Sequence, residues 1–130
     1  MQDRPTAREL LEAVRRFLED DVVAALDGPG RFHARVAANV LAIVGRELEG
    51  EEGLLVAEWT RVATLLGRPA DAPPERLAAL RAAVAEMTAA LCSRIRRGDA
   101  DASPFREAVR AAVTASVAEK LAVANPRMAR

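Results

Sequence analysis

The sequence predicts an all-α protein, a single-domain up-and-down bundle of about five helices around a buried central helix. Three observations support this fold class. Apolar residues recur at intervals of three and four in five stretches that are separated by turn residues. No stretch alternates apolar and polar residues between hairpin turns, as strands do. The predicted connections are short, which favours antiparallel packing of successive helices, and 130 residues suit one domain.

The first helix is predicted over residues 7–26. Thr6 and Glu9 have the spacing of a capping box, in which each side chain binds the other residue's backbone amide. Apolar residues recur at helical spacing from Leu10 onwards. Two i,i+4 ion pairs are expected on the polar side: Glu12 with Arg16 and Arg15 with Glu19. The segment 27–30, Asp-Gly-Pro-Gly, is expected to end the helix and turn the chain.

The second helix, residues 31–49, is expected to be the buried centre of the bundle. Its apolar side chains spread over about half of the helical circumference, and Ala34, Ala38, Ala42 and Gly45 form a second, smooth flank. A helix that is apolar on most sides is usually buried. Only a narrow polar strip remains, and Gly50 is expected to end the helix.

Three further helices are predicted over residues 51–66, 74–97 and 104–124. In the third helix Trp59 is expected in the core, and Gly67 is expected to cap the end. The fourth carries a near-heptad seam that suits bundle packing or a homodimer: Leu77, Leu80, Val84, Met87, Leu91 and Ile95. The fifth should be capped by Ser103. Its expected core side is Phe105, Val109, Val113, Val117 and Leu121.

Charge and cysteine content restrict the classes of partner. The chain has 19 basic and 19 acidic residues, so no net field would recruit nucleic acid or an anionic membrane. No apolar run approaches the ~20 residues of a membrane span, and the N-terminus lacks the pattern of a secretory signal. One cysteine, Cys92, excludes an intramolecular disulfide. We therefore expect a cytoplasmic protein with neither a nucleic-acid nor a membrane partner.

The polar strip of the second helix is a candidate ligand-binding site. It contains Arg31, Arg35, Asn39 and Arg46, and the Gly-Pro-Gly segment leads into its N-terminus. Backbone amides at a helix N-terminus together with arginines can bind a phosphate or a carboxylate. The alternative is structural: the arginines pair with acidic residues of a neighbouring helix, and Asn39 holds a loop. His33 is the other candidate, as a hydrogen-bonded core histidine or as a ligand contact or general acid/base.

Glu47 and Lys120 are expected to form a buried or half-buried ion pair. Each lies among apolar residues of its predicted helix, and an isolated buried charge is costly. Cys92 is expected to be a buried structural thiol. With one histidine, one cysteine and no glycine-rich phosphate loop, the sequence gives no reason to expect a metal, a cofactor or a catalytic residue. An enzyme is therefore the least favoured class.

Three stretches resemble a small bacterial family of helical domains of unknown function: RPTARELL at 4–11, FHARVAAN at 32–39 and KLAVANP at 120–126. The central stretch fits the pattern FHxRVAxN. Genes of that family often lie beside those for aminoglycoside-phosphotransferase-like kinases and acyl-CoA dehydrogenases. The resemblance implies a setting in CoA-ester metabolism and supplies no catalytic residue.

The combined expectation is a non-catalytic accessory domain that binds a protein. The resemblance implies a kinase-like or acyl-CoA dehydrogenase-like enzyme as partner, and the seam of the fourth helix also allows a homodimer. The alternative is a domain that binds a small phosphate- or carboxylate-bearing ligand, such as an acyl-CoA. A large exposed apolar surface would favour the first function, and a deep pocket lined by arginine would favour the second.

Overall fold

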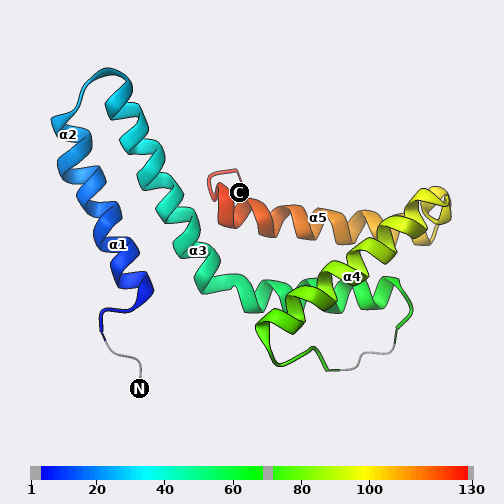
Figure 1. Ribbon diagram of the computed structural model, residues 1–130. Helices are drawn as coiled ribbons and strands as arrows, with labels where there is room; N and C mark the ends of the chain where they lie inside the picture. The colour runs from blue at the N-terminus through cyan, green and yellow to red at the C-terminus, as the bar shows by residue number, and fades with distance from the viewer. Residues whose placement is uncertain (1–3, 69–71, 129–130) are drawn as a thin grey trace. The chain divides into compact units, whose positions relative to one another are not determined.

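The computed structural model describes residues 4–68 and 72–128, and this part of the chain is helical with no strand. Its four long helices are α1 (Ala7–Phe17), α3 (Gly28–Leu65), α4 (Leu77–Arg96) and α5 (Phe105–Ala124) (Figure 1). The chain divides into two compact units, Met1–Gly50 and Glu51–Arg130. We refer to them as the N-terminal and C-terminal units.

The first predicted helix forms with the expected cap and an unexpected π-helical turn. The Glu9 amide donates to Thr6 Oγ1 at 3.3 Å, and the Thr6 amide donates to Glu9 Oε2 at 2.7 Å, which confirms the capping box. After α1 the chain continues through a π-helical segment, Leu18–Val22, into the short α2, Val23–Ala25. A π-turn adds one residue per turn and so rotates every later side chain around the helix.

The second and third predicted helices form one helix, α3. The expected break at Gly50 is wrong, because α3 runs without interruption from Gly28 to Leu65. Each glycine inside a helix costs only ~1 kcal/mol relative to alanine, and the good helix formers around Gly50 outweigh that cost. The start also differs by three residues. Gly28 has φ +55°, and Pro29 lies in the first helical turn, where its missing N–H has no helical partner to lose.

The expected burial of residues 31–49 is not confirmed. In the N-terminal unit α1 and the first part of α3 lie side by side and run in opposite directions (Figure 1). Only Ala34 and Ala38 are buried among the described hydrophobic residues of this unit. Phe32 is 63% exposed, and Val36 and Val40 are also exposed. The small flank of α3 is therefore packed, whereas its large apolar side chains are not.

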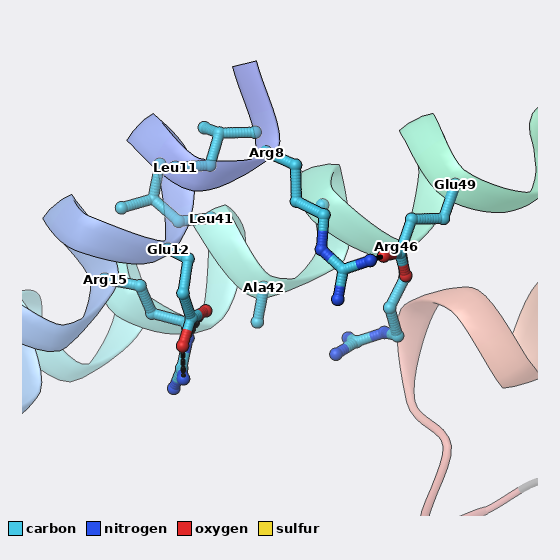
Figure 2. A pocket seen from close by; sticks show the side chains of 9 residues that line it. Arg8, Leu11, Glu12, Arg15, Leu41, Ala42, Arg46 and Glu49 are labelled. Atoms are coloured by element: carbon cyan, nitrogen blue, oxygen red, sulfur yellow. Dashed lines mark hydrogen bonds and ion pairs between the residues drawn. The ribbon is translucent and has the colours of Figure 1, made fainter. Parts of the chain in front are cut away.

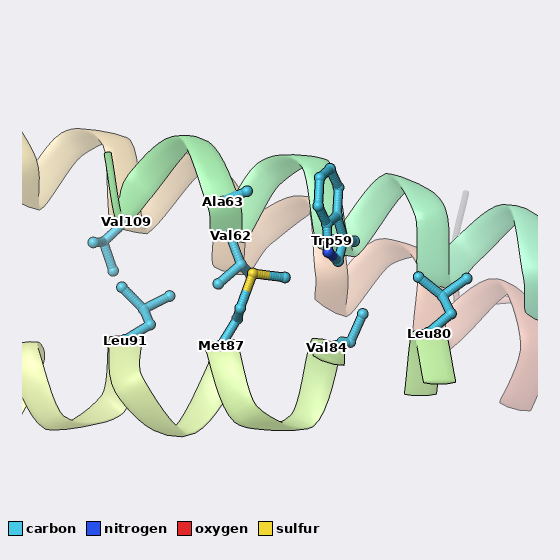
Figure 3. Packing of buried hydrophobic residues seen from close by; sticks show 8 residues of the cluster. All are labelled: Trp59, Val62, Ala63, Leu80, Val84, Met87, Leu91 and Val109. Carbon is cyan, nitrogen blue, oxygen red and sulfur yellow. The ribbon is translucent and has the colours of Figure 1, made fainter. Parts of the chain in front are cut away.

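The C-terminal unit contains the large buried side chains (Figure 3). Its core consists of Trp59, Val62 and Ala63 of α3, Leu80, Val84, Met87 and Leu91 of α4, and Val109 of α5. The predicted core positions of Trp59 and of the four central seam residues are thus confirmed. On α5 only part of the prediction is confirmed, because Val113 and Val117 are exposed.

The predicted cap at the end of α3 forms, whereas the predicted cap at the start of α5 does not. Gly67 has φ +65°, its amide donates to Thr64 O at 3.1 Å, and the Arg68 amide donates to Ala63 O at 3.1 Å. This pair of bonds is the Schellman motif, so the predicted cap is confirmed. Part of the loop that follows, residues 69–71, lies outside the described residues. The Ser103 cap is wrong, because its hydroxyl donates to Glu107 Oε1 at 2.6 Å and α5 begins at Phe105.

Two arginines connect the helices of the C-terminal unit. Arg94 donates to Leu65 O at 3.0 Å and to Asp99 Oδ2 at 2.9 Å, and its guanidinium carbon lies 4.2 Å from the Phe105 ring centroid. It therefore contacts the end of α3, the short 3₁₀ helix Asp99–Asp101, and α5. Arg61 of α3 forms a two-pronged ion pair with Glu119 of α5, at 2.8 and 2.5 Å.

Candidate functional site

Arg31 supports the turn between α2 and α3. Its Nε donates to Val23 O at 3.0 Å and to Leu26 O at 2.8 Å, and its Nη2 lies 3.7 Å from Asp27 Oδ1. The last carbonyls of a helix have no helical partners, so a cation at this position satisfies them. An anion bound by Arg31 would have to compete with these contacts.

The other residues of the predicted strip are spread along α3. Arg35 and Asn39 are exposed, and Arg46 is half-buried. At 1.5 Å per residue, Arg31 and Arg46 are separated by roughly 22 Å along the helix, too far for one small anion to contact both. The strip therefore consists of separate positions. Arg35 lies near the head of α3, whereas Arg46 lines a pocket with residues of α1.

His33, Glu47 and Lys120 are exposed. The His33 ring packs edge-on against the ring of Phe32, with a centroid separation of 5.7 Å. His33 is therefore a surface residue in this structure, not a core histidine. Glu47 belongs to the N-terminal unit and Lys120 to the C-terminal unit. Their ion pair stays a prediction.

A pocket of about 290 Å³ lies between α1 and α3 in the N-terminal unit (Figure 2). Its walls carry three arginines and two glutamates: Arg8, Glu12 and Arg15 of α1, with Arg46 and Glu49 of α3. Leu11, Leu41, Ala42 and Gly45 complete the lining. The pocket thus combines a small apolar patch with both positively and negatively charged side chains.

We call α1 and the first part of α3 the hairpin, and the pocket between them the hairpin pocket. Most of the charged side chains in its lining interact with other residues of the hairpin. Glu12 accepts from Arg15 at 2.8 and 2.7 Å and from Arg16 at 2.9 Å, and these bonds lower its pKa to about 2. The same pairing raises the pKa of Arg15. Arg8 pairs with Glu49, and Arg46 also has an interaction partner. The Arg8–Glu49 pair joins α1 to α3, whereas the bonds of Glu12 lie within α1. Pairing of the strip arginines with acidic residues of a neighbouring helix stays a prediction.

A larger groove of about 690 Å³ lies in the C-terminal unit. Its apolar lining includes Leu55, Val84, Ala85 and Ala89, and its charged lining consists of Arg81, Arg96 and Lys120 with Glu58. Arg81 is held by Glu51 at 2.5 Å, which also lowers the pKa of that carboxyl group. The Thr88 hydroxyl in the lining is buried without a hydrogen-bond partner. The groove combines apolar surface with an excess of positive charge.

The described residues contain no group of three or more histidine, cysteine, aspartate or glutamate side chains that could hold a metal ion. The half-buried Cys92 lies in the C-terminal unit, whose sequence contains no histidine to activate a thiol. Over the same described ranges, no helix has the length and apolar character required to cross a membrane.

Comparison with known families identifies the chain. A family model described as a domain of unknown function (DUF6285) matches residues 24–128. The chain belongs to this family. The DUF6285 match includes α3, α4 and α5 and leaves α1 outside it. No curated protein and no solved structure matches the chain.

Sequence reasoning missed most of the residues that line the two pockets. In this DUF6285 chain, Arg8, Glu12 and Arg15 meet α3 because α1 packs on its small flank, and local spacing on α1 does not reveal that register. The alanines at 34, 38 and 42 were the available signal, since small residues mark where a neighbouring helix can approach. Arg96 in the C-terminal groove gave no sequence signal.

Proposed function

We propose that this chain is a cytoplasmic helical accessory domain that binds another protein through the N-terminal unit. The observation that carries the proposal is a large exposed apolar surface on both of its helices. On α1 the exposed residues are Leu10, Val14 and Phe17, which we call the α1 stripe. On α3, positions 32, 36, 40, 44 and 48 form an unbroken row, four residues apart, of large apolar side chains. We call this row the α3 ridge.

The exposure of these side chains favours protein binding. Four of the five ridge residues are exposed, and Val44 is half-buried. Soluble monomers seldom expose apolar patches above a few hundred Å², and larger patches mark interaction sites. The arginines beside them support the same reading, because Arg15, Arg31 and Arg8 already bind groups of the same unit. Several polar side chains of the hairpin therefore have partners within it, whereas the stripe and most of the ridge are exposed.

The partner that the family resemblance implies is a kinase-like or acyl-CoA dehydrogenase-like enzyme. The test is co-purification of the tagged chain from its native host, with Val14→Glu compared against Val113→Glu. Both valines are 50% exposed, but Val113 lies on α5 in the other unit. The proposal is supported if the wild type and Val113→Glu capture an enzyme that Val14→Glu does not capture. The purified enzyme should then bind the purified wild-type chain. Equal capture by all three variants contradicts it.

The C-terminal groove favours a second candidate function, binding of a phosphate- or carboxylate-bearing ligand such as an acyl-CoA. Arg96 and Lys120 would contact the anionic group, and the apolar lining would contact an acyl chain. Ligand at a hundred times its Kd stabilises the folded state by about 2.7 kcal/mol, which thermal unfolding detects. Acetyl-CoA and inorganic phosphate are the probes.

Three variants locate such a ligand. If it occupies the groove, Arg96→Ala should remove the stabilisation, whereas Arg110→Ala, an exposed position on α5, should keep it. If the ligand binds at the N-terminus of α3, Arg35→Ala should remove the stabilisation instead. Unchanged unfolding of the wild type in both probes would end the ligand proposal.

A further inference from the structure

The first half of α3 has the composition of a central helix but has one neighbouring helix in its own unit. Its small flank packs against α1, where Ala34 and Ala38 are buried. The α3 ridge is left exposed, and so is the α1 stripe. In a hairpin of two helices, each helix covers only one flank of the other. A helix that is apolar on most of its sides therefore stays partly uncovered in such a hairpin. The remaining sides require further helices.

We propose that a second copy of this chain supplies those helices and that two hairpins associate through their α3 ridges and α1 stripes into a four-helix bundle. This inference rests on the proposed function, since it names a partner for the same apolar surface. In the absence of an enzyme partner, the surface is covered by an identical hairpin. The interface would be isologous, with the same residues contributed by both copies.

The α3 ridge has a geometry that packs against itself. Residues four apart on a helix form a ridge inclined to the helix axis, and ridges of this kind from two helices interdigitate in the commonest packing class of globular proteins. The α3 ridge spans Phe32 to Leu48 with no polar member. A second α3 presents the same ridge, so a twofold axis between them satisfies both helices at once.

The exposed area is adequate for a stable dimer. Seven large apolar residues of the stripe and ridge are each about half exposed: Leu10, Val14, Phe17, Phe32, Val36, Val40 and Leu48. At roughly 150–200 Å² of surface for each such residue, one hairpin exposes on the order of 600 Å² of apolar area. Two copies would bury roughly 1,200 Å², the lower limit of specific interfaces before any polar rim is counted.

Charge does not oppose the association of identical copies. Residues 4–50 contain eight acidic and seven basic side chains, so the unit carries a formal charge of only −1. Several of these charges are paired within the hairpin, as in Glu12 with Arg15 and Arg8 with Glu49. Like-charge repulsion, which keeps strongly charged proteins apart, is therefore weak between two hairpins.

The solution mass of the full chain tests the proposal. Sedimentation equilibrium at micromolar concentration should give twice the 13.9 kDa of one chain. Val36→Glu should raise the dissociation constant by about a hundredfold or more, because it buries an unpaired charge at the interface. Val113→Glu, an equivalent change at an exposed valine of α5, should leave the dimer intact. Helical circular dichroism and Trp59 fluorescence verify that both variants are folded.

Cysteine crosslinking shows whether the α3 ridge itself forms the contact. In a Cys92→Ser background, oxidised Val36→Cys should give a covalent dimer, whereas Asn39→Cys, which is exposed but outside the ridge, should not. A monomeric wild type, a dimer that survives Val36→Glu, or a dimer that requires Val113 would each overturn the inference. A monomer that still captures an enzyme in a Val14-dependent manner would overturn self-association alone and leave the proposed function standing.

Discussion

Replacement of Leu80 by alanine tests whether the C-terminal unit depends on its own core. Leu80 is 1% exposed and contributes from α4 to the cluster around Trp59 (Figure 3). The change removes three carbon atoms from a fully packed position. Lost transfer free energy and the residual cavity together should lower the free energy of unfolding by about 3 kcal/mol.

The assay is urea unfolding followed by the fluorescence of Trp59, the only tryptophan of the chain. Trp59 is buried in the C-terminal core, so its signal reports this unit specifically. With a slope of about 1–1.5 kcal/mol per molar urea, the midpoint should fall by about 2–3 M without a change in slope. A far smaller shift would show that Leu80 is not packed as described.

A matched control is Val113→Ala on α5. Val113 is half exposed, so its truncation leaves no cavity and should shift the same midpoint by less than about 0.5 M. If both variants shifted the fluorescence transition equally, the division into buried and exposed positions in this unit would be refuted.

Three further predictions concern charge and backbone. Glu12 has a pKa of about 2, below its ordinary 4.5, so its ion pairs should stabilise the hairpin fully above about pH 5 and lose that effect as the pH falls towards 2. Carbon-detected NMR titration should show the pKa of Glu12 rising in Arg15→Gln. A double-mutant cycle at Arg61 and Glu119 should give a coupling free energy of about 1–2 kcal/mol by urea unfolding. Gly98→Ala should destabilise by about 1 kcal/mol in thermal unfolding, because φ is +89° and a Cβ would lie 2.9 Å from Asp101 Oδ2.

Arg35→Gln, a distant exposed arginine, should leave the Glu12 titration unchanged, and an ordinary Glu12 pKa in the wild type would disprove the pairing. A coupling near zero would make the Arg61 pair a surface contact of no consequence. Gly53→Ala should stabilise α3 by up to about 1 kcal/mol, since nothing lies within 4 Å of its Cβ position, and destabilisation there would contradict the helical assignment.

The features that sequence predicted best depend on neighbours within one or two helical turns. The capping box at Thr6, the Schellman end at Gly67 and the ion pair of Glu12 with Arg16 all form as expected. Each joins groups three to five residues apart, so spacing alone determines the geometry. The central seam of α4 was equally predictable from the sequence, because its four buried residues recur at intervals of three and four.

The features that sequence could not supply depend on which helix faces which. Glycine often follows a helix end, so Gly50 predicts a break, but the continuity of α3 depends on the residues on both sides of it together. The pairing of Arg61 with Glu119 spans 58 positions, and nothing in the sequence ranks it above other arginine–glutamate combinations. The hairpin pocket likewise required the register of α1 against α3. The row of apolar residues on α3 was visible as a pattern, but the exposure of its side chains was not.

The contacts of Arg94 have a consequence for the rate at which the C-terminal unit opens. Its three partners, the Leu65 carbonyl, Asp99 and the Phe105 ring, come together only when α3, α4 and α5 are all in place. An interaction that needs every helix docked forms late in folding and is lost early in unfolding. We expect Arg94→Lys, which keeps the charge but loses the planar fork, to accelerate unfolding and leave the folding rate nearly unchanged. Arg94 would then slow the unfolding of the C-terminal unit without affecting how fast it folds.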